Sequence, residues 1–189
     1  MLPVALGCLP DTADVIVVDG AYRSFPHTKP YSTDGTLDIA RAWGARVVAV
    51  SKAWPDQIAK RTFCLGLAPV VLVLDADEIL YGPLPTLPAD ADVGWVWLRS
   101  PIYDAPYAEP RLFRVGPGWH YDKRHHWIYD GQGGLVCSHT KPGPGYRHVQ
   151  LATVIDNMRN WRSGDRNRCK HEYAIERNKE ELRHREEGA

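Results

Sequence analysis

Apolar runs alternate with amphipathic stretches in the first half of the chain. Short runs rich in β-branched residues at 14–18, 45–50 and 70–74 predict strands, and the last of these is expected to be buried on both faces. Between them, apolar residues recur with helical spacing at 36–43 and 55–67. Alternating strands and helices favour a parallel sheet with right-handed crossovers. This pattern predicts a Rossmann-like first half.

The second half of the chain has a different pattern. A strand is expected near 93–98, with shorter extended pieces at 111–114 and 119–121 that would pair antiparallel. Loops rich in Gly and Pro dominate 131–145. Beyond these loops the sequence is charged and free of proline, which predicts a helical tail over 151–189.

Length and charge narrow the class of protein. With 189 residues, the chain fits a single domain. We divide it into a nucleotide-binding half (1–82), an acceptor half (83–150) and the helical tail. Lys and Arg number 23 and Asp and Glu also number 23, so no net field favours nucleic acid or an anionic membrane.

Targeting and cysteine signals are weak. No apolar run approaches the roughly 20 residues of a membrane-spanning helix, and the first residues lack the basic flank of a signal peptide. The four cysteines form no Cys-x-x-Cys pair, which argues against a disulfide framework or a thiolate zinc site. We therefore expect a cytoplasmic protein with free thiols.

The chemistry of the chain is concentrated where the run at 70–74 meets Asp75-Ala76-Asp77-Glu78. In an extended segment, residues two apart point the same way, so the carboxylates of Asp75 and Asp77 are expected side by side. Mg²⁺ or Mn²⁺ joins such carboxylates and completes its coordination with water and phosphate oxygens. The alternative is that these acids only form a solvated turn.

Three segments stand in a recognisable order: Val17-Val18-Asp19-Gly20, Ser32-Thr33-Asp34-Gly35-Thr36 and Leu74-Asp75-Ala76-Asp77-Glu78. Together they resemble the family 2 glycosyltransferases of GT-A fold. The match covers about 14–80 and continues more weakly through 111–121. The resemblance implies an α/β fold: a GT-A-like three-layer sandwich with a Rossmann-like parallel sheet first, mixed strands and loops second, and a C-terminal helix.

The resemblance also implies roles for residues that contact a nucleotide-sugar donor linked to UDP or GDP. Asp19, with Gly20 beside it, would contact the nucleoside, and Arg61 would lie along the nucleotide. Asp75 would face the ribose or the metal. These are the expected donor-binding residues.

A bound Mn²⁺ or Mg²⁺ is implied as well. Asp75 and Asp77 would be its ligands, and His126 takes the position of the family's late histidine ligand. The metal would stabilise the leaving diphosphate. An inverting transfer then needs a carboxylate base, for which Asp130 and Glu109 rank ahead of Asp104. The acceptor stays open between protein, glycan, lipid headgroup and modified nucleobase.

Departures from the family pattern leave two alternative functions open. The family's usual first strand looks absent, which a truncated chain, a misplaced start or a minimal enzyme would each explain. Residues 21–31 form an insertion, Thr62 replaces an Asn, and Trp127 replaces a Glu after the motif histidine. The alternatives are a nucleotide- or glycan-binding module without turnover and a nucleotidyltransferase.

Overall fold

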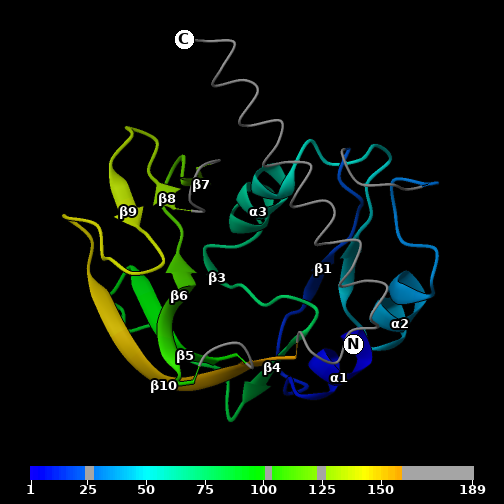
Figure 1. Cartoon of the computed structure of the whole chain (residues 1–189), viewed down its shortest axis with the longest axis horizontal. Coiled ribbons are helices and arrows are strands. Elements are labelled where there is room, and N and C mark those ends of the chain that lie inside the picture. The colour runs from blue at the N-terminus through cyan, green and yellow to red at the C-terminus, as the bar shows by residue number, and fades with distance from the viewer. Residues whose placement is uncertain (24–27, 101–103, 123–126, 159–189) are drawn as a thin grey trace.

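The computed structural model describes residues 1–23, 28–100, 104–122 and 127–158. Within these ranges the chain is a mixed α/β structure in which sheets predominate (Figure 1). In chain order the elements are α1 (Leu2–Gly7), β1 (Ile16–Val18), α2 (Thr36–Ala42), β2 (Arg46–Val48), α3 (Gln57–Leu65), β3 (Val70–Leu72), β4 (Glu78–Tyr81), β5 (Val93–Arg99), β6 (Tyr107–Arg114), β7 (His120–Tyr121), β8 (Ile128–Tyr129), β9 (Leu135–Cys137) and β10 (His148–Asn157).

The largest sheet has five strands in the order β3-β6-β5-β10-β4. Only β5 and β10 run parallel; the other neighbours are antiparallel. Its centre is apolar because β5 buries five of its seven residues, Trp97 and Arg99 being the exceptions. The expected strands at 93–98 and 111–114 are thus confirmed, as are their antiparallel contacts.

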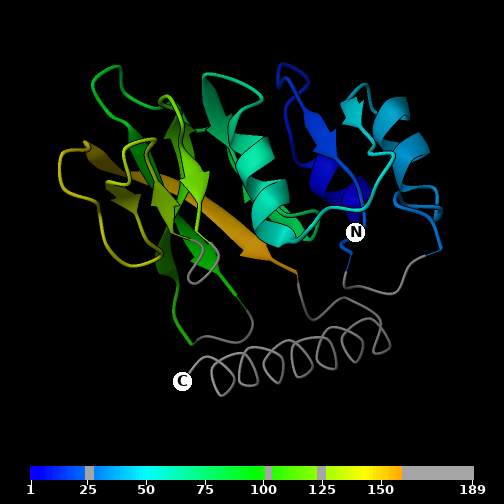
Figure 2. The same cartoon turned by 90° about the horizontal axis from the view of Figure 1, so that it is seen from above.

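The first half of the chain gives a smaller parallel sheet than the sequence pattern predicts. β1 and β2 pair in parallel, with Val17 opposite Val47, and α2 connects them. The positions of both strands and of the helices α2 and α3 are as predicted. These two strands nevertheless form a separate sheet, beside the five-stranded one in both views (Figures 1 and 2).

The third predicted strand is the main correction. We expected residues 70–74 to be buried on both faces within a parallel sheet. In the structure, β3 is an edge strand that pairs antiparallel with β6, and Val70 is 42% exposed. The apolar run does form a strand, but β1 does not pair with it.

The predicted helical tail is also wrong over its first residues. β10 extends to Asn157 and lies between β5 and β4. Val149, Leu151 and Ile155 of β10 belong to the apolar clusters of the sheet. These contacts favour a strand over 148–157, whereas the prediction of a helix was based on the charge pattern of the residues that follow. The rest of the expected tail, 159–189, lies outside the described residues.

Three short helices accompany the sheets in the part of the chain that the structure describes. Asp56 is the N-cap of α3, and its carboxylate accepts a hydrogen bond from Ala59 N at 2.7 Å. α1 was not predicted, because its proline was interpreted as an interruption. In the structure Pro3 stands in the first turn, where a backbone N–H would have no partner within the helix, so that the missing N–H of proline costs nothing. None of the helices within the described ranges is long and apolar enough to cross a membrane.

Gly20, two residues after the end of β1, is closely packed. Its φ is 139°, and a Cβ atom there would lie 2.6 Å from both Trp54 Nε1 and Val50 Cγ2. Gly35 also has a positive φ, 83°, but open space around it. We expect Gly20→Ala to lower the free energy of unfolding by about 2–4 kcal/mol, through strain and overpacking.

The matched control is Gly35→Ala, which carries only the backbone strain and should lose about 1–2 kcal/mol. Urea denaturation of both variants measures the two losses. Equal losses would contradict the close packing of Gly20 against Trp54 and Val50.

Candidate functional site

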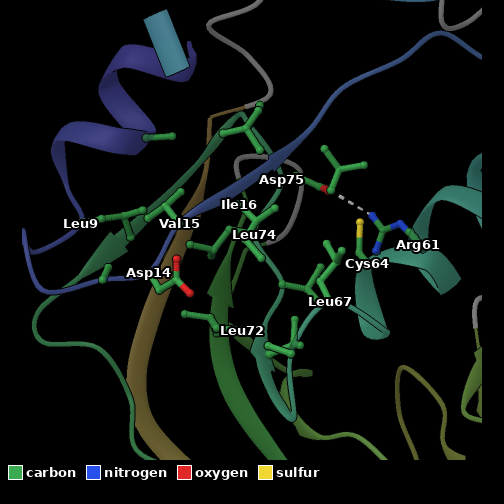
Figure 3. A pocket seen from close by; sticks show the side chains of 18 of the residues that line it. Leu9, Asp14, Val15, Ile16, Arg61, Cys64, Leu67, Leu72, Leu74 and Asp75 are labelled. Atoms are coloured by element: carbon green, nitrogen blue, oxygen red, sulfur yellow. Dashed lines mark hydrogen bonds and ion pairs between the residues drawn. The ribbon is translucent and has the colours of Figure 1, made fainter. Parts of the chain in front are cut away.

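The carboxyl ends of β1 and β3 meet the same turn of α3. Lys60 Nζ donates to the carbonyl of Gly20, after β1, at 3.4 Å. The next helical residue, Arg61, donates from Nη2 to both carboxylate oxygens of Asp75, after β3, at 3.2 and 3.1 Å (Figure 3). Two consecutive cations therefore stand at two strand ends, where ligands of α/β sheets usually bind.

Asp19 organises the loop that follows β1. Ser32 donates to its carboxylate twice, from the backbone N at 2.8 Å and from Oγ at 2.6 Å, and Asp19 is buried. Ser32 is therefore a partner of Asp19. The N-cap of α2 is Gly35 and not one of the predicted Ser, Thr or Asp residues; Asp34, just before it, accepts a hydrogen bond from Thr36 N at 3.2 Å. The implied contact between Asp19 and a nucleoside stays a prediction.

Lys60 lies in a partly desolvated position close to two acids. Burial lowers its pKa, while the charges of Asp19 and Asp75 act in the opposite direction. Its ammonium group also lies 5.8 Å from the ring centre of Tyr22, within cation–π range. A partly buried cation beside two carboxylates is a local charge arrangement suited to an anionic ligand that competes with them.

The acidic junction after β3 is a turn. Glu78 N donates to the carbonyl of Asp75, and Asp75 N donates to Glu78 Oε2, both at 2.9 Å. The alternation of an extended strand is lost there, so the expected side-by-side placement of Asp75 and Asp77 does not follow from it. The Asp75 side chain is 44% exposed, whereas Asp77 is buried.

The metal-ligand prediction is not tested by the structure. Within the described ranges no group of three or more His, Cys, Asp or Glu side chains is arranged to hold an ion. His126 lies outside those ranges. Asp75 has an exposed carboxylate, and Mg²⁺ commonly takes only one or two protein carboxylates together with substrate phosphates.

A buried ion pair supports this turn from behind. Arg111, on β6, donates from Nη2 to Glu78 Oε1 at 2.7 Å, and their side chains are 5% and 0% exposed. Burial raises the pKa of Glu78 to about 7, although the charge of Arg111 acts to lower it. Arg111 retains two buried nitrogens, Nε and Nη1, without a partner among the described residues.

Glu109 continues the line of charges from Arg111 to His139. Its carboxylate lies 3.5 Å from Arg111 Nη2 and 3.4 Å from His139 Nδ1. Burial acts to raise the pKa of Glu109, but the hydrogen bond with His139 and the charge of Arg111 outweigh it and hold the pKa below its usual value. Glu109 is therefore an ionised carboxylate at neutral pH.

Asp130, the other predicted base, lies in a different environment. It occupies the turn between β8 and β9, where it accepts from Gln132 N at 2.8 Å and Gly134 N at 2.7 Å. Tyr146 donates to its other oxygen, and this hydrogen bond is the main reason for a lowered pKa. These contacts describe a carboxylate that stabilises a hairpin turn.

Two cavities meet at Arg61. The larger, of about 540 Å³, extends along β1 and β3 and reaches Lys60, Arg61 and Asp75 (Figure 3). The smaller is lined by Arg61, Glu109, Arg111 and His139, among others, and Asp130 lines neither. The structure thus brings Arg61, Asp75 and Glu109 together and leaves Asp130 apart.

Sequence reasoning assigned no specific role to four members of this site: Lys60, Glu78, Arg111 and His139. One signal was available for Arg111, because residues 109 and 111 are two apart on a strand and so share a face. No sequence signal pairs Glu78 with Arg111, which are 33 positions apart. A search of family models finds no match to this chain, and a search of curated proteins finds no significant relative.

The pKa of Glu78 gives a stability test with a defined sign. Folded Glu78 keeps its proton to about pH 7, whereas the ordinary value is 4.5. The folded state therefore binds more protons between these values, and the free energy of unfolding falls as pH rises through this window. We expect Glu78→Gln to remove that fall, which amounts to about 2–3 kcal/mol.

Urea denaturation at pH 4.5, 5.5 and 7 measures the effect. Asp130→Asn is the control, since the pKa of Asp130 is lowered and this carboxylate lies in the turn between β8 and β9, apart from the Arg111–Glu78 pair. Parallel pH profiles for the wild type and Glu78→Gln would show that Glu78 is already ionised throughout.

Proposed function

We propose that this chain binds a nucleotide-diphosphate sugar at the ends of β1 and β3 and transfers the sugar to an acceptor, with Mn²⁺ or Mg²⁺ as cofactor. The observation that carries the proposal is the placement of Lys60 and Arg61 on one turn of α3, where they contact Gly20 and Asp75. The three ordered motifs of the sequence supply the enzyme class.

The diphosphate is the part of the donor that this arrangement suits best. Arg61 presents a planar guanidinium, and Arg binds phosphate oxygens through pairs of parallel hydrogen bonds. In the structure Arg61 is occupied by the exposed Asp75. A diphosphate would compete for Arg61 and release Asp75, whose carboxylate is then available to a cation.

Asp75 is the described residue best placed to hold the metal, and Asp77 and His126 remain the other predicted ligands. A bound Mn²⁺ or Mg²⁺ would neutralise charge that develops on the departing diphosphate. Lys60, partly buried beside Asp19 and Asp75, adds a fixed positive charge on the same side. Each of these contributions favours the leaving group in the transition state.

Glu109 is the better of the two predicted bases. It shares the smaller cavity with Arg61, whereas Asp130 is held by its turn and by Tyr146. An ionised carboxylate can accept the proton of an acceptor hydroxyl as the sugar is displaced from the opposite face. The cavity beside Glu109 measures about 10 Å³, which is room for about one water, so it would have to open for an acceptor to reach this carboxylate. His139, in contact with Glu109, would orient it.

A binding module without turnover is the second candidate. Its supporting observation is that Glu109 is already paired with both Arg111 and His139, so that its lowered pKa makes it a weak base. Such a module would bind the nucleotide through the same cations. Turnover separates the two candidates.

Nucleotide binding is tested by calorimetric titration of UDP and GDP with and without Mn²⁺. We expect Mn²⁺ to raise the affinity for one of them, and Asp75→Asn to reduce this Mn²⁺-dependent gain by about tenfold or more, because a charged ligand is lost. Asp38→Asn is the matched control, since Asp38 is an exposed acid on α2. An unchanged Mn²⁺ dependence in Asp75→Asn would reject Asp75 as a ligand.

Turnover is tested by the release of nucleoside diphosphate from UDP- and GDP-sugars, with water as the acceptor. We expect Glu109→Gln to lower the rate by about 10²–10⁴-fold, the usual contribution of a general base, and to leave nucleotide affinity within about twofold. Asp130→Asn should retain the wild-type rate. Binding without any release by the wild type would favour the binding module.

A further inference from the structure

The smaller cavity, beside Glu109, has the size of a single water molecule. Its volume is about 10 Å³, close to the least that a bound water needs. Part of its wall is formed by Phe113, Ile128 and Cys137, and all three side chains are buried. A hydroxyl group carried on a sugar, a peptide or a lipid would therefore have to displace this wall before it reached Glu109.

Arg111 supplies hydrogen-bond donors that a water would satisfy. Its side chain lines the cavity and is 5% exposed, and its Nε and Nη1 atoms are buried without a partner among the described residues. Guanidinium nitrogens only donate hydrogen bonds, so each of these atoms requires an acceptor. A water oxygen is the acceptor that a cavity of this size admits.

Glu109 can accept a hydrogen bond from the same water. One of its carboxylate oxygens lies 3.5 Å from Arg111 Nη2 and the other lies 3.4 Å from His139 Nδ1. An ionised carboxylate has about four lone-pair sites, so acceptor capacity remains after these two contacts. A water that accepts from Arg111 and donates to Glu109 has the two or more polar partners that buried waters require.

Arg61 connects this cavity with the proposed donor site. Arg61 lines the cavity and donates from Nη2 to Asp75. The proposed function places the diphosphate of the donor at Arg61, and the anomeric carbon of the sugar is bonded directly to that diphosphate. A water held beside Arg61 and Glu109 would therefore lie close to the carbon that reacts.

We propose that the acceptor at this site is water, so that the chain hydrolyses a nucleotide-diphosphate sugar to the free sugar and the nucleoside diphosphate. This inference rests on the proposed function and names its acceptor. The water oxygen forms a bond to the anomeric carbon while the bond from that carbon to the diphosphate oxygen breaks. The electron pair of the broken bond leaves with the diphosphate, and a proton of the water passes to Glu109.

The contacts of the water suit this reaction. Arg111 would occupy one lone pair of the water oxygen, which leaves the other lone pair for the bond to carbon. The positive charge of Arg111 favours the negative charge that builds on this oxygen as its proton moves to Glu109. Water is also the acceptor that reaches Glu109 without displacement of Phe113, Ile128 or Cys137.

Product analysis of the whole chain with Mn²⁺ and UDP- or GDP-sugars tests the proposal. Dilute methanol is the probe of cavity size, because methanol resembles water chemically but carries an additional methyl group. We expect the wild type to release free sugar and no methyl glycoside, at a rate that added glycans or peptides change by less than about twofold. In oxygen-18 water, the label should enter the sugar and be absent from the nucleoside diphosphate.

Two variants separate the cavity from the core around it. Ile128→Val removes one methyl group from the wall and should allow methyl glycoside to form. Val136→Ala is the matched control, because Val136 belongs to the same buried core but is not among the described residues that line the cavity. This control should give the same products as the wild type.

The proposal is overturned if the wild type forms methyl glycoside in proportion to methanol. It is also overturned if release requires a glycan or peptide, or rises by about tenfold or more with one while the sugar becomes attached to it. These results would leave the proposed transferase intact with a different acceptor. Nucleotide binding without release in the presence of any of these acceptors would overturn both proposals and favour the binding module.

Discussion

The buried ion pair between Arg111 and Glu78 is the constraint on which the site depends. Both side chains are almost completely removed from solvent, so removing either one would leave the other's buried polar group without its hydrogen-bond partner. The ion pair connects Glu78, the first residue of β4, to Arg111, near the centre of β6. Glu78 uses its other oxygen to accept from Asp75 N, and this bond fixes the turn in which Asp75 presents an exposed carboxylate to Arg61. The large sheet thereby determines where the acidic turn lies.

From that turn, charged and polar side chains continue in both directions. Toward α3 they are Asp75, Arg61 and Lys60, and Lys60 contacts the end of β1; toward β9 they are Arg111, Glu109 and His139. Each of these groups already has a partner of opposite charge nearby, so a ligand could replace one partner at modest cost. An anionic diphosphate at Arg61 and a cation at Asp75 would be such an exchange. This is the physical basis of the proposed transferase.

Much of the first half of the fold was predictable, and most of the pairing was not. The strands at 16–18, 46–48 and 70–72 and the helices α2 and α3 follow from local periodicity, because each is a local pattern. Sheet order depends on contacts distant in sequence, so β3 was expected within a parallel sheet, and residues 151–157 of β10 were expected to be helical. At the site, Asp19, Arg61 and Asp75 were singled out by motif and Glu109 as an acid. Glu78 and Arg111 were not predicted as a pair, because their role depends on the burial of both side chains, which the sequence does not reveal.

The central claim is that a nucleotide and a metal bind together where Gly20, Arg61 and Asp75 converge. Paramagnetic broadening by Mn²⁺ in the presence of UDP or GDP tests it most directly, because it locates the ion on the assigned backbone amides of the whole chain. The account predicts that broadening is strongest at residues 75–77, extends to Gly20 and Arg61, requires the nucleotide, and is absent from the β8–β9 turn. Broadening that is centred elsewhere, or that is the same without nucleotide, would contradict the account.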